Sequence, residues 1–197
     1  MIEFKERGIL IFSKISSENN LYLKFLTQKD EIITGLSFGG STKKKKNIFQ
    51  IGYFLNIVIK NKNKNFPNSI SAELSKPYYH NIFNDKYKLH ALLTLVSLLN
   101  ISIIEGQKVS GLFNLSENII EILANEKKWI INYFIFLLNL LKIIGYDIDY
   151  QKNTSKDYLN LDSLQFSNSS ITKSIKFPHL LLNNKININV ENANSFF

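Results

Sequence analysis

The sequence has 197 residues, of which 45% are hydrophobic, and it contains no cysteine. A chain of this length and composition can bury one or two packed cores, which argues against wholesale disorder. The missing cysteines exclude disulfides, thiolate metal sites and cysteine nucleophiles. No signal peptide is recognisable at the N-terminus, and the most apolar window, residues 129–144, is shorter than the roughly 20 residues that a bilayer requires. We therefore expect a cytoplasmic protein with no membrane partner.

Positive charge is concentrated towards the N-terminal end. The 24 Lys and Arg against 16 Asp and Glu give a net charge of +8. Residues 1–80 carry 13 basic and 6 acidic side chains, a net +7, whereas residues 81–150 carry −1 and residues 151–197 carry +2. Arg7 is the sole arginine, and the abundance of Lys, Asn and Ile is typical of AT-rich coding, so the clustering is more informative than the total. The asymmetry indicates a polyanion-binding face within residues 1–80.

Residues 1–80 have the pattern of a small all-β domain. Short segments rich in β-branched and aromatic residues alternate with turn formers. They are Gly8–Lys14, Leu21–Leu26, Glu31–Phe38, Tyr53–Lys60 and Ile70–Ser75. Five short strands cannot cover both faces of an open sheet, whereas a closed barrel removes the exposed edges. The pattern therefore predicts a five-stranded OB-fold barrel, with loops at residues 39–47 and 61–68.

The apolar period changes from two to about 3.6 residues in the next part of the chain. The predicted helices are Asp85–Asn100, about Glu117–Ala124 and about Glu126–Ile144. Asn84 or Asp85 can cap the first helix, Ser116 the second, and Gly145 can end the third in a left-handed conformation. The third helix is apolar nearly all round, which is typical of a helix buried in a bundle.

These elements predict an α+β protein of three parts. Residues 1–80 form the OB-fold nucleic-acid-binding domain, and residues 81–150 form a helical domain. Residues 151–197 are rich in Ser, Asn, Lys and Thr, with a few apolar runs such as Phe177–Leu182. We expect this last part to be poorly structured or partly extended.

The sequence offers no catalytic or metal-binding constellation. His80, His90 and His179 are far apart and lack the spacing of metal ligands. The segment from Gly35 to Gly40 resembles a phosphate-binding loop, but Ser41 and Thr42 follow where such a loop has Lys and Ser or Thr. We therefore expect no enzyme activity, no small-molecule substrate, no cofactor and no metal.

One constellation is suited to binding nucleic acid. Two glycines let the backbone bend, Ser and Thr hydroxyls can donate to phosphate oxygens, and four consecutive lysines must splay apart. Alternate lysines near the end of the fourth strand share one face. The predicted binding residues are Gly39, Gly40, Ser41, Thr42, Lys43, Lys44, Lys45, Lys46, Lys60, Lys62 and Lys64.

Aromatic residues near this constellation have two interpretations. OB-folds hold single strands in basic grooves whose aromatic side chains stack on bases. The nearby rings are Phe38, Phe49, Tyr53, Phe66, Tyr78 and Tyr79. Phe38 and Tyr53 fall within predicted strands, where burial in the core is the more common fate. A lysine run is, in turn, often an ordinary solvated loop.

The order of these parts resembles the RecO family of bacterial recombination proteins. Residues 8–21 look like the first hairpin of that family, Gly39-Gly40 with the lysines looks like its glycine-and-basic loop, and residues 49–52 look like its Leu-Gln-Pro-Gly turn with Ile51 in place of Pro. Residues 133–149 look like its long central helix, which ends in a Leu-Gly-Tyr pattern. The resemblance covers about residues 1–150 and continues faintly through Tyr158-Leu159 and residues 177–180.

The resemblance implies a function without catalysis. Family members bind single- and double-stranded DNA, promote annealing, and assist RecA loading together with RecR and the single-strand-binding protein, which would place this chain at the nucleoid. The acidic, aromatic-ended tail of the latter protein would need an apolar pocket near cations of the helical part. The available cations are Lys86, Lys88, Lys108, Lys127, Lys128 and Lys142.

Two departures from the family pattern affect the expectation. Some members hold zinc through four cysteines after the Gly-Tyr segment, which this sequence lacks. Members also usually continue into further C-terminal helices, so this chain resembles a reduced member.

Two other classes of function fit the residues. A basic OB-fold barrel suits an RNA-binding or translation-associated protein equally well, although such a protein does not need a near-neutral helical partner. A protein-interaction module is a further alternative, in which the helical part binds a partner and the lysine run is incidental.

Overall fold

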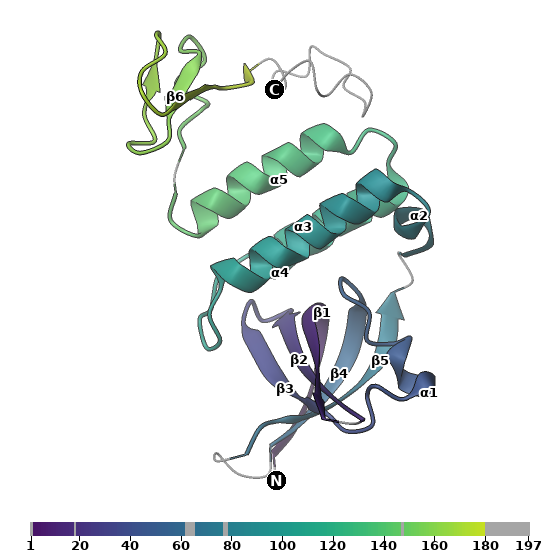
Figure 1. The fold of residues 1–197 in the computed structure, drawn as a ribbon. Coiled ribbons are helices and arrows are strands. Elements are labelled where there is room, and N and C mark those ends of the chain that lie inside the picture. Colours follow the sequence, from purple (N-terminus) through teal and green to yellow (C-terminus); the bar gives the residue numbers. More distant parts are fainter. Residues whose placement is uncertain (1, 18, 62–65, 77–78, 147, 180–197) are drawn as a thin grey trace. The chain divides into compact units, whose positions relative to one another are not determined.

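The computed structural model describes residues 2–17, 19–61, 66–76, 79–146 and 148–179 (Figure 1). The chain forms two compact units, residues 1–125 and residues 126–197, and each is described by itself. The helices after the barrel therefore divide between the two units. The predicted division of the sequence into residues 1–80, 81–150 and 151–197 stays a prediction.

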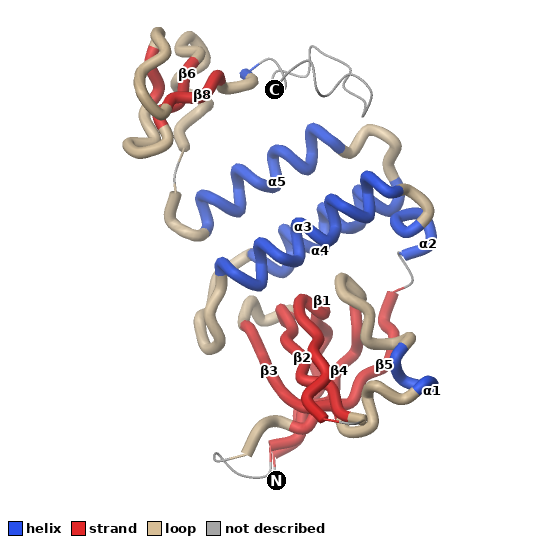
Figure 2. Tube along the Cα trace, in the orientation of Figure 1, coloured by secondary structure: helices blue, strands red, loops and turns tan. Residues whose placement is uncertain are grey.

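The first unit begins with the predicted closed barrel, whose strands are distinguished in Figure 2. The strands pair in the order β1-β2-β3-β5-β4. Their bounds are β1 Ile2–Ser17, β2 Asn20–Thr27, β3 Ile32–Ser37, β4 Phe54–Asn61 and β5 Ser69–Lys76. All five predicted strands are present. β1 begins before Gly8 because the mostly charged residues 3–7 pair with β4, so backbone pairing extends the strand beyond its apolar run.

Alternation along the strands separates a dry interior from an outer face. In β2, Leu21, Leu23 and Phe25 are buried while the residues between them are partly exposed. The interior is completed by residues of the other strands and by Phe49 of the β3–β4 connection. Its further members are Leu10, Leu55, Ile57, Ile59 and Ile70. The period-2 pattern therefore indicates which side chains face the interior of the barrel and which lie on its outer face.

The barrel closes where β3 meets β5 in parallel, and this closure requires a glycine. The Leu36 amide donates to the Asn68 carbonyl oxygen at 2.7 Å, and the Asn68 side chain donates to the Thr34 carbonyl oxygen at 2.9 Å. A Cβ atom on Gly35 would lie 2.5 Å from the Asn68 oxygen and 2.8 Å from the Ile70 side chain. Both distances are shorter than van der Waals contact, so any side chain at position 35 would push the two strands apart.

Three helices complete the first unit: α2 Tyr79–Phe83, α3 Lys86–Ser102 and α4 Leu112–Asn125. Asp85 caps α3 as predicted, with its carboxylate accepting from the amides of Tyr87 and Lys88. α4 begins one turn earlier than predicted. Ser116, the expected cap, is buried inside the helix and donates to the Leu112 carbonyl oxygen at 2.8 Å.

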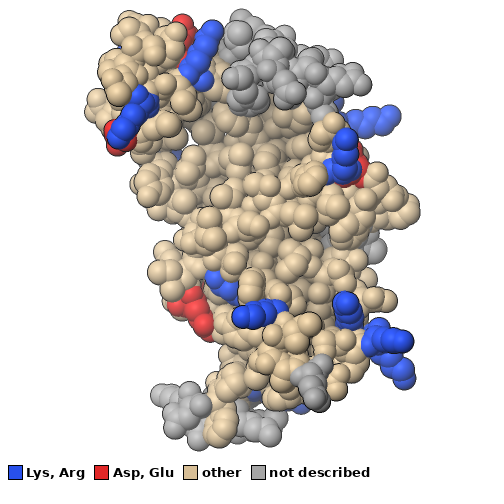
Figure 3. Space-filling model, in the orientation of Figure 1, with Lys and Arg blue, Asp and Glu red and all other residues tan. Residues whose placement is uncertain are grey.

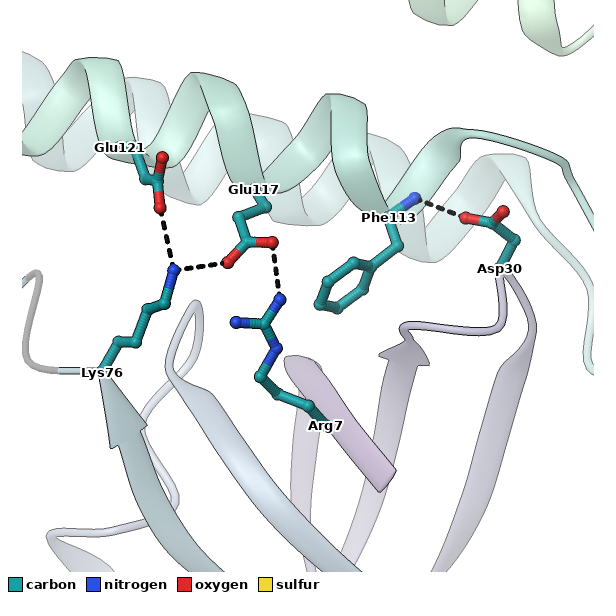
Figure 4. Close-up of polar contacts among 6 residues, drawn as sticks. All are labelled: Arg7, Asp30, Lys76, Phe113, Glu117 and Glu121. Atoms are coloured by element: carbon teal, nitrogen blue, oxygen red, sulfur yellow. Dashed lines mark hydrogen bonds and ion pairs between the residues drawn. The ribbon is translucent and has the colours of Figure 1, made fainter. Parts of the chain in front are cut away.

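The true cap of α4 comes from the barrel. Asp30, in the β2–β3 turn, accepts hydrogen bonds from the amides of Gly111 and Phe113, both at 2.8 Å (Figure 4). A carboxylate at a helix N-terminus satisfies free amides and favours the helix dipole. Because Asp30 is about 80 residues away in sequence, local patterns could not have indicated this start.

The second unit contains α5 Ile130–Ile143 and a small sheet of β6 Tyr158–Asn160, β7 Phe166–Ser167 and β8 Ser174–Lys176, in the order β7-β6-β8. α5 begins at Ile130 rather than at Glu126, and Gly145 follows it with φ +104°, as its predicted C-terminal position requires. Leu138, Leu159, Phe166 and Phe177 form the core. The short strands agree with the partly extended chain expected after residue 150, whereas residues 180–197 lie outside the described part.

Replacing Gly35 with alanine should destabilise the protein. The added methyl group meets a backbone oxygen that cannot rotate away, so we expect Gly35→Ala to lower the free energy of unfolding by about 1–3 kcal/mol. Gly8→Ala is the matched control, since a Cβ there would lie 3.3 Å from its nearest neighbour. Urea denaturation monitored by circular dichroism measures both. An equal loss in the two variants would contradict the closure described above.

Candidate nucleic-acid interface

The lysine run forms a single helical turn, α1 Lys43–Lys46, between β3 and β4. The sequence predicted a loop throughout residues 39–47. The turn forms because the amides of Lys45 and Lys46 both donate to the Thr42 carbonyl oxygen, at 3.0 and 2.9 Å, and because lysine tolerates helical geometry well. Successive side chains then point about 100° apart. All four lysines are exposed, and Figure 3 shows basic side chains projecting from the right side of the barrel, where Figure 1 draws α1.

Hydrogen bonds fix this turn on the β1–β2 hairpin. The Gly39 amide donates to the Asn20 side-chain oxygen at 3.1 Å, and the Ser41 amide donates to the Asn19 carbonyl oxygen at 3.2 Å. Gly39 has φ +67°, a conformation that favours glycine, and the Thr42 hydroxyl donates to its carbonyl oxygen at 2.8 Å. Glycine at position 39 therefore shapes the turn, and the lysines stand on a defined part of the barrel rather than on a free loop.

The aromatic residues near the run have different fates. Phe49 is buried in the barrel, and Tyr53 is half-buried, where desolvation raises the pKa of its hydroxyl. Phe38 is 59% exposed, because β3 ends at the inward-facing Ser37 and the next side chain points outward. The expectation that Phe38 lies in the core is thus wrong. Lys45 donates to the carbonyl oxygen of this same residue at 3.3 Å.

The structure describes only some of the other predicted aromatic residues and lysines. Phe66 is exposed, whereas Tyr78 and the side chain of Tyr79 lie outside the described part of the chain. Lys60, at the end of β4, forms an ion pair of 3.0 Å with Glu3 of β1. Lys62 and Lys64 also lie outside the described residues. The proposed lysine face on β4 therefore stays a prediction.

Two basic residues of the barrel are held by helix α4. Glu117 accepts from Arg7 at 2.7 Å and from Lys76 at 2.9 Å, and Glu121 pairs with Lys76 at 3.0 Å (Figure 4). The Arg7 guanidinium also lies 5.2 Å from the centre of the Phe113 ring. This network joins barrel to helix, and it occupies cations that a simple charge count would assign to a ligand.

Two further lysines are similarly engaged. Lys24 donates to the carbonyl oxygens of Asn100 and Ile103 at 2.9 and 3.3 Å, and burial lowers the pKa of this lysine. Lys29 pairs with the buried carboxylate of Glu6, and that hydrogen bond raises the pKa of the lysine. By contrast, no ion pair joins Lys43–Lys46 to a carboxylate within the part of the chain that the structure describes. The helical turn therefore carries four exposed lysines that have no carboxylate partner among the described residues.

Neither a candidate metal site nor a membrane-spanning helix is found among the described residues. None of their His, Asp and Glu side chains form a group of three or more that could hold a metal ion. Of the helices in the described ranges, none combines the length and apolar character needed to cross a membrane. Asp149 forms a 3.0 Å ion pair with Lys152, and the hydrogen bond from that lysine lowers the pKa of the carboxyl group.

Comparison with known proteins gives a consistent result. Residues 84–157 match the family described as "Recombination protein O C terminal". The chain is 26% identical over 151 residues to DNA repair protein RecO of Rickettsia canadensis and 27% identical over 160 residues to that of Rickettsia bellii. The alignments cover 77% and 79% of this chain. A RecO protein of Rickettsia akari is 25% identical over 187 residues, which is 92% of this chain and 78% of the relative.

The first two alignments span only part of the relatives. They cover 62% of the Rickettsia canadensis protein and 66% of the Rickettsia bellii protein. The family match begins at residue 84, whereas the lysine turn lies in the barrel before it.

Glu117 should contribute more to stability than Glu121. Glu117→Ala leaves the half-buried Arg7 without its carboxylate, so we expect a loss of about 1–3 kcal/mol in the free energy of unfolding. Glu121→Ala removes a more exposed carboxylate from Lys76, which keeps Glu117, and should cost below about 1 kcal/mol. Urea denaturation at low salt measures both. Equal losses of unfolding free energy in the two variants would contradict a special contribution of Glu117 to the packing of α4 on the barrel.

Proposed function

We propose that the chain is a member of the RecO family, to which it is similar, and that it is a DNA-binding accessory protein of recombination and repair without a catalytic site. The observation that carries the proposal is the lysine turn Lys43–Lys46, which is exposed, fixed by hydrogen bonds and adjacent to the exposed ring of Phe38. Such a surface suits phosphates next to an unpaired base.

Charge placement supports a division of labour between the parts of the chain. The cations of the barrel that face α4 are neutralised by Glu117 and Glu121, while the lysine turn has no such partner among the described residues. DNA would therefore approach the barrel from the side of α1. The helical part carries little net charge and would serve protein partners instead.

The family suggests what this binding would accomplish. We propose that the chain binds single- and double-stranded DNA, promotes annealing of complementary strands, and assists RecA loading together with RecR and the single-strand-binding protein. In that case it would work at the nucleoid in the cytoplasm. The relatives named DNA repair protein RecO support the repair setting, and the barrel with its lysine turn supports direct contact with DNA.

Removing the lysine turn should weaken binding to every sequence. A plot of the logarithm of the binding constant against the logarithm of the salt concentration falls by roughly 0.7 for each contact with a phosphate of a single strand. If all four lysines make such contacts, they contribute about 3 to the slope. Replacing Lys43–Lys46 with alanine should flatten the slope by that amount. Fluorescence anisotropy with labelled DNA and RNA of equal length measures the slope. The triple variant Lys152→Ala, Lys173→Ala and Lys176→Ala is the control, because it removes lysines of the second unit.

Unchanged affinity in the four-lysine variant would refute the interface. Tighter binding of RNA than of DNA by the unaltered chain would instead favour the RNA-binding alternative.

Partner binding should be separable from DNA binding. We expect the full chain to bind a peptide that copies the acidic, aromatic-ended tail of the single-strand-binding protein, because its helical part offers apolar surface and cations such as Lys86 and Lys108. The variant without Lys43–Lys46 should bind the same peptide with unchanged affinity. Anisotropy with a labelled peptide tests this. Loss of peptide binding in that variant would place the partner on the barrel.

A further inference from the structure

An aromatic pair occupies the outer face of the barrel next to the lysine turn. The register between β1 and β2 shifts between Leu10 and Phe12, and beyond the shift Phe12 pairs with Lys24 and Lys14 pairs with Tyr22. Directly paired residues of antiparallel strands share a face. Because Leu21 and Leu23 of β2 face the interior, Phe12 and Tyr22 must face outward.

The two rings contact each other and remain partly exposed. Their centres are 6.3 Å apart, with an angle of 69° between their planes, so the edge of one meets the face of the other. Both side chains are half-buried rather than covered. An edge-to-face pair leaves one broad ring surface open to solvent.

The aromatic surface extends across the third strand. Leu36 of β3 pairs with Tyr22, so Lys14, Tyr22 and Leu36 form a row across β1, β2 and β3 on the outer face, and Phe12 lies diagonally beside Tyr22. Phe38 follows Leu36 on the same side, at the start of the segment that leads into α1. In Figure 1 these three strands lie side by side, and in the same view Figure 3 shows Lys and Arg side chains over the barrel.

The end of α3 and the segment after it contact one part of this outer face. The part near the β1–β2 hairpin is open. Lys24 is bound to the C-terminal end of α3, and the Thr34 hydroxyl donates to the Glu105 carboxylate at 2.6 Å. The open part is bordered instead by the exposed Lys14 and by the lysine turn. An apolar aromatic row bordered by cations complements a chain of bases bordered by phosphates.

We propose that the outer face formed by Phe12, Tyr22 and Phe38 is a base-stacking surface for single-stranded nucleic acid, with the phosphates directed towards Lys14 and the lysine turn. This inference rests on the proposed function, to which it adds residues and a strand preference. A duplex keeps its bases stacked on each other, so it gains nothing from the rings and contacts the lysines alone. Single strands should therefore bind more tightly than duplexes of equal length.

The test compares ring removal with removal of charge. Tyr22→Leu and Phe38→Leu keep apolar volume but lose the stacking surface. The probe is a labelled oligothymidine. We expect each substitution to weaken its binding by about tenfold, which is within the range for loss of one stacked base. The dependence on salt should not change, because no charge is removed. Affinity for a duplex and for an oligonucleotide made of abasic sites should remain that of the unaltered chain.

Matched variants separate stacking from folding. Tyr22→Phe keeps the ring and should retain full affinity for oligothymidine. Tyr87→Leu removes an exposed ring that lies beside Lys86 on α3, away from this face, and should have no effect. Thermal melting of every variant reports whether the barrel remains folded.

The possible outcomes distinguish this inference from the proposed function. Unchanged oligothymidine affinity in both ring variants, together with a loss in the variant lacking Lys43–Lys46, would overturn the stacking surface and leave the DNA-binding function standing. Equal weakening for oligothymidine, duplex and abasic probes would also overturn it, since that pattern marks general damage to the barrel. No effect of either the rings or the lysines would reject both.

Discussion

Closure of the barrel between β3 and β5 is the constraint on which the rest of the first unit depends. Gly35 lets the two strands approach, and Asn68 then bridges them with a main-chain and a side-chain hydrogen bond. Once β3 is fixed on both sides, its last residues have defined directions, so Ser37 points inward and Phe38 outward. Because the end of β3 leads directly into the lysine turn, the contact between β3 and β5 helps to determine where Lys43–Lys46 lie.

The arrangement also explains why net charge is a poor guide to the interface. Residues 1–80 carry a net +7, yet Arg7, Lys24, Lys29 and Lys76 all engage carboxylates or carbonyl oxygens of the protein itself. Of these, Arg7, Lys24 and Lys76 help to attach α3 and α4 to the barrel, whereas Lys29 pairs with Glu6 inside it. The cations that remain for a ligand are those that stay exposed and have no carboxylate partner, and this is a property of the fold rather than of composition.

Sequence patterns predicted the parts of the fold that depend on neighbouring residues. Alternation revealed the five strands, and the local capping of α3 by Asp85 was visible because the cap lies next to its helix. The start of α4 was missed because its cap, Asp30, is supplied by the barrel. Phe12 and Tyr22 were also missed. The register shift in β1 turns Phe12 outward, and no residue type announces such a shift. The lysine run was predicted to be a binding site, which stays a prediction, and its helical form was missed because it depends on hydrogen bonds to the Thr42 carbonyl oxygen.

The second unit shows how a cysteine-free chain can stabilise a very small sheet. Strands of two or three residues provide too few hydrogen bonds to persist by pairing alone. Phe177 lies 5.0 Å from Phe166 and 4.8 Å from His179, measured between ring centres, and Tyr150 stacks on it at 6.1 Å. A ring nitrogen of His179 lies 2.8 Å from the Lys156 carbonyl oxygen, which ties the end of the sheet to its beginning. Phe177, which belongs to an apolar run within a polar region of the sequence, is thus the centre of this core, because its partners Phe134, Tyr150 and Phe166 come from separate segments.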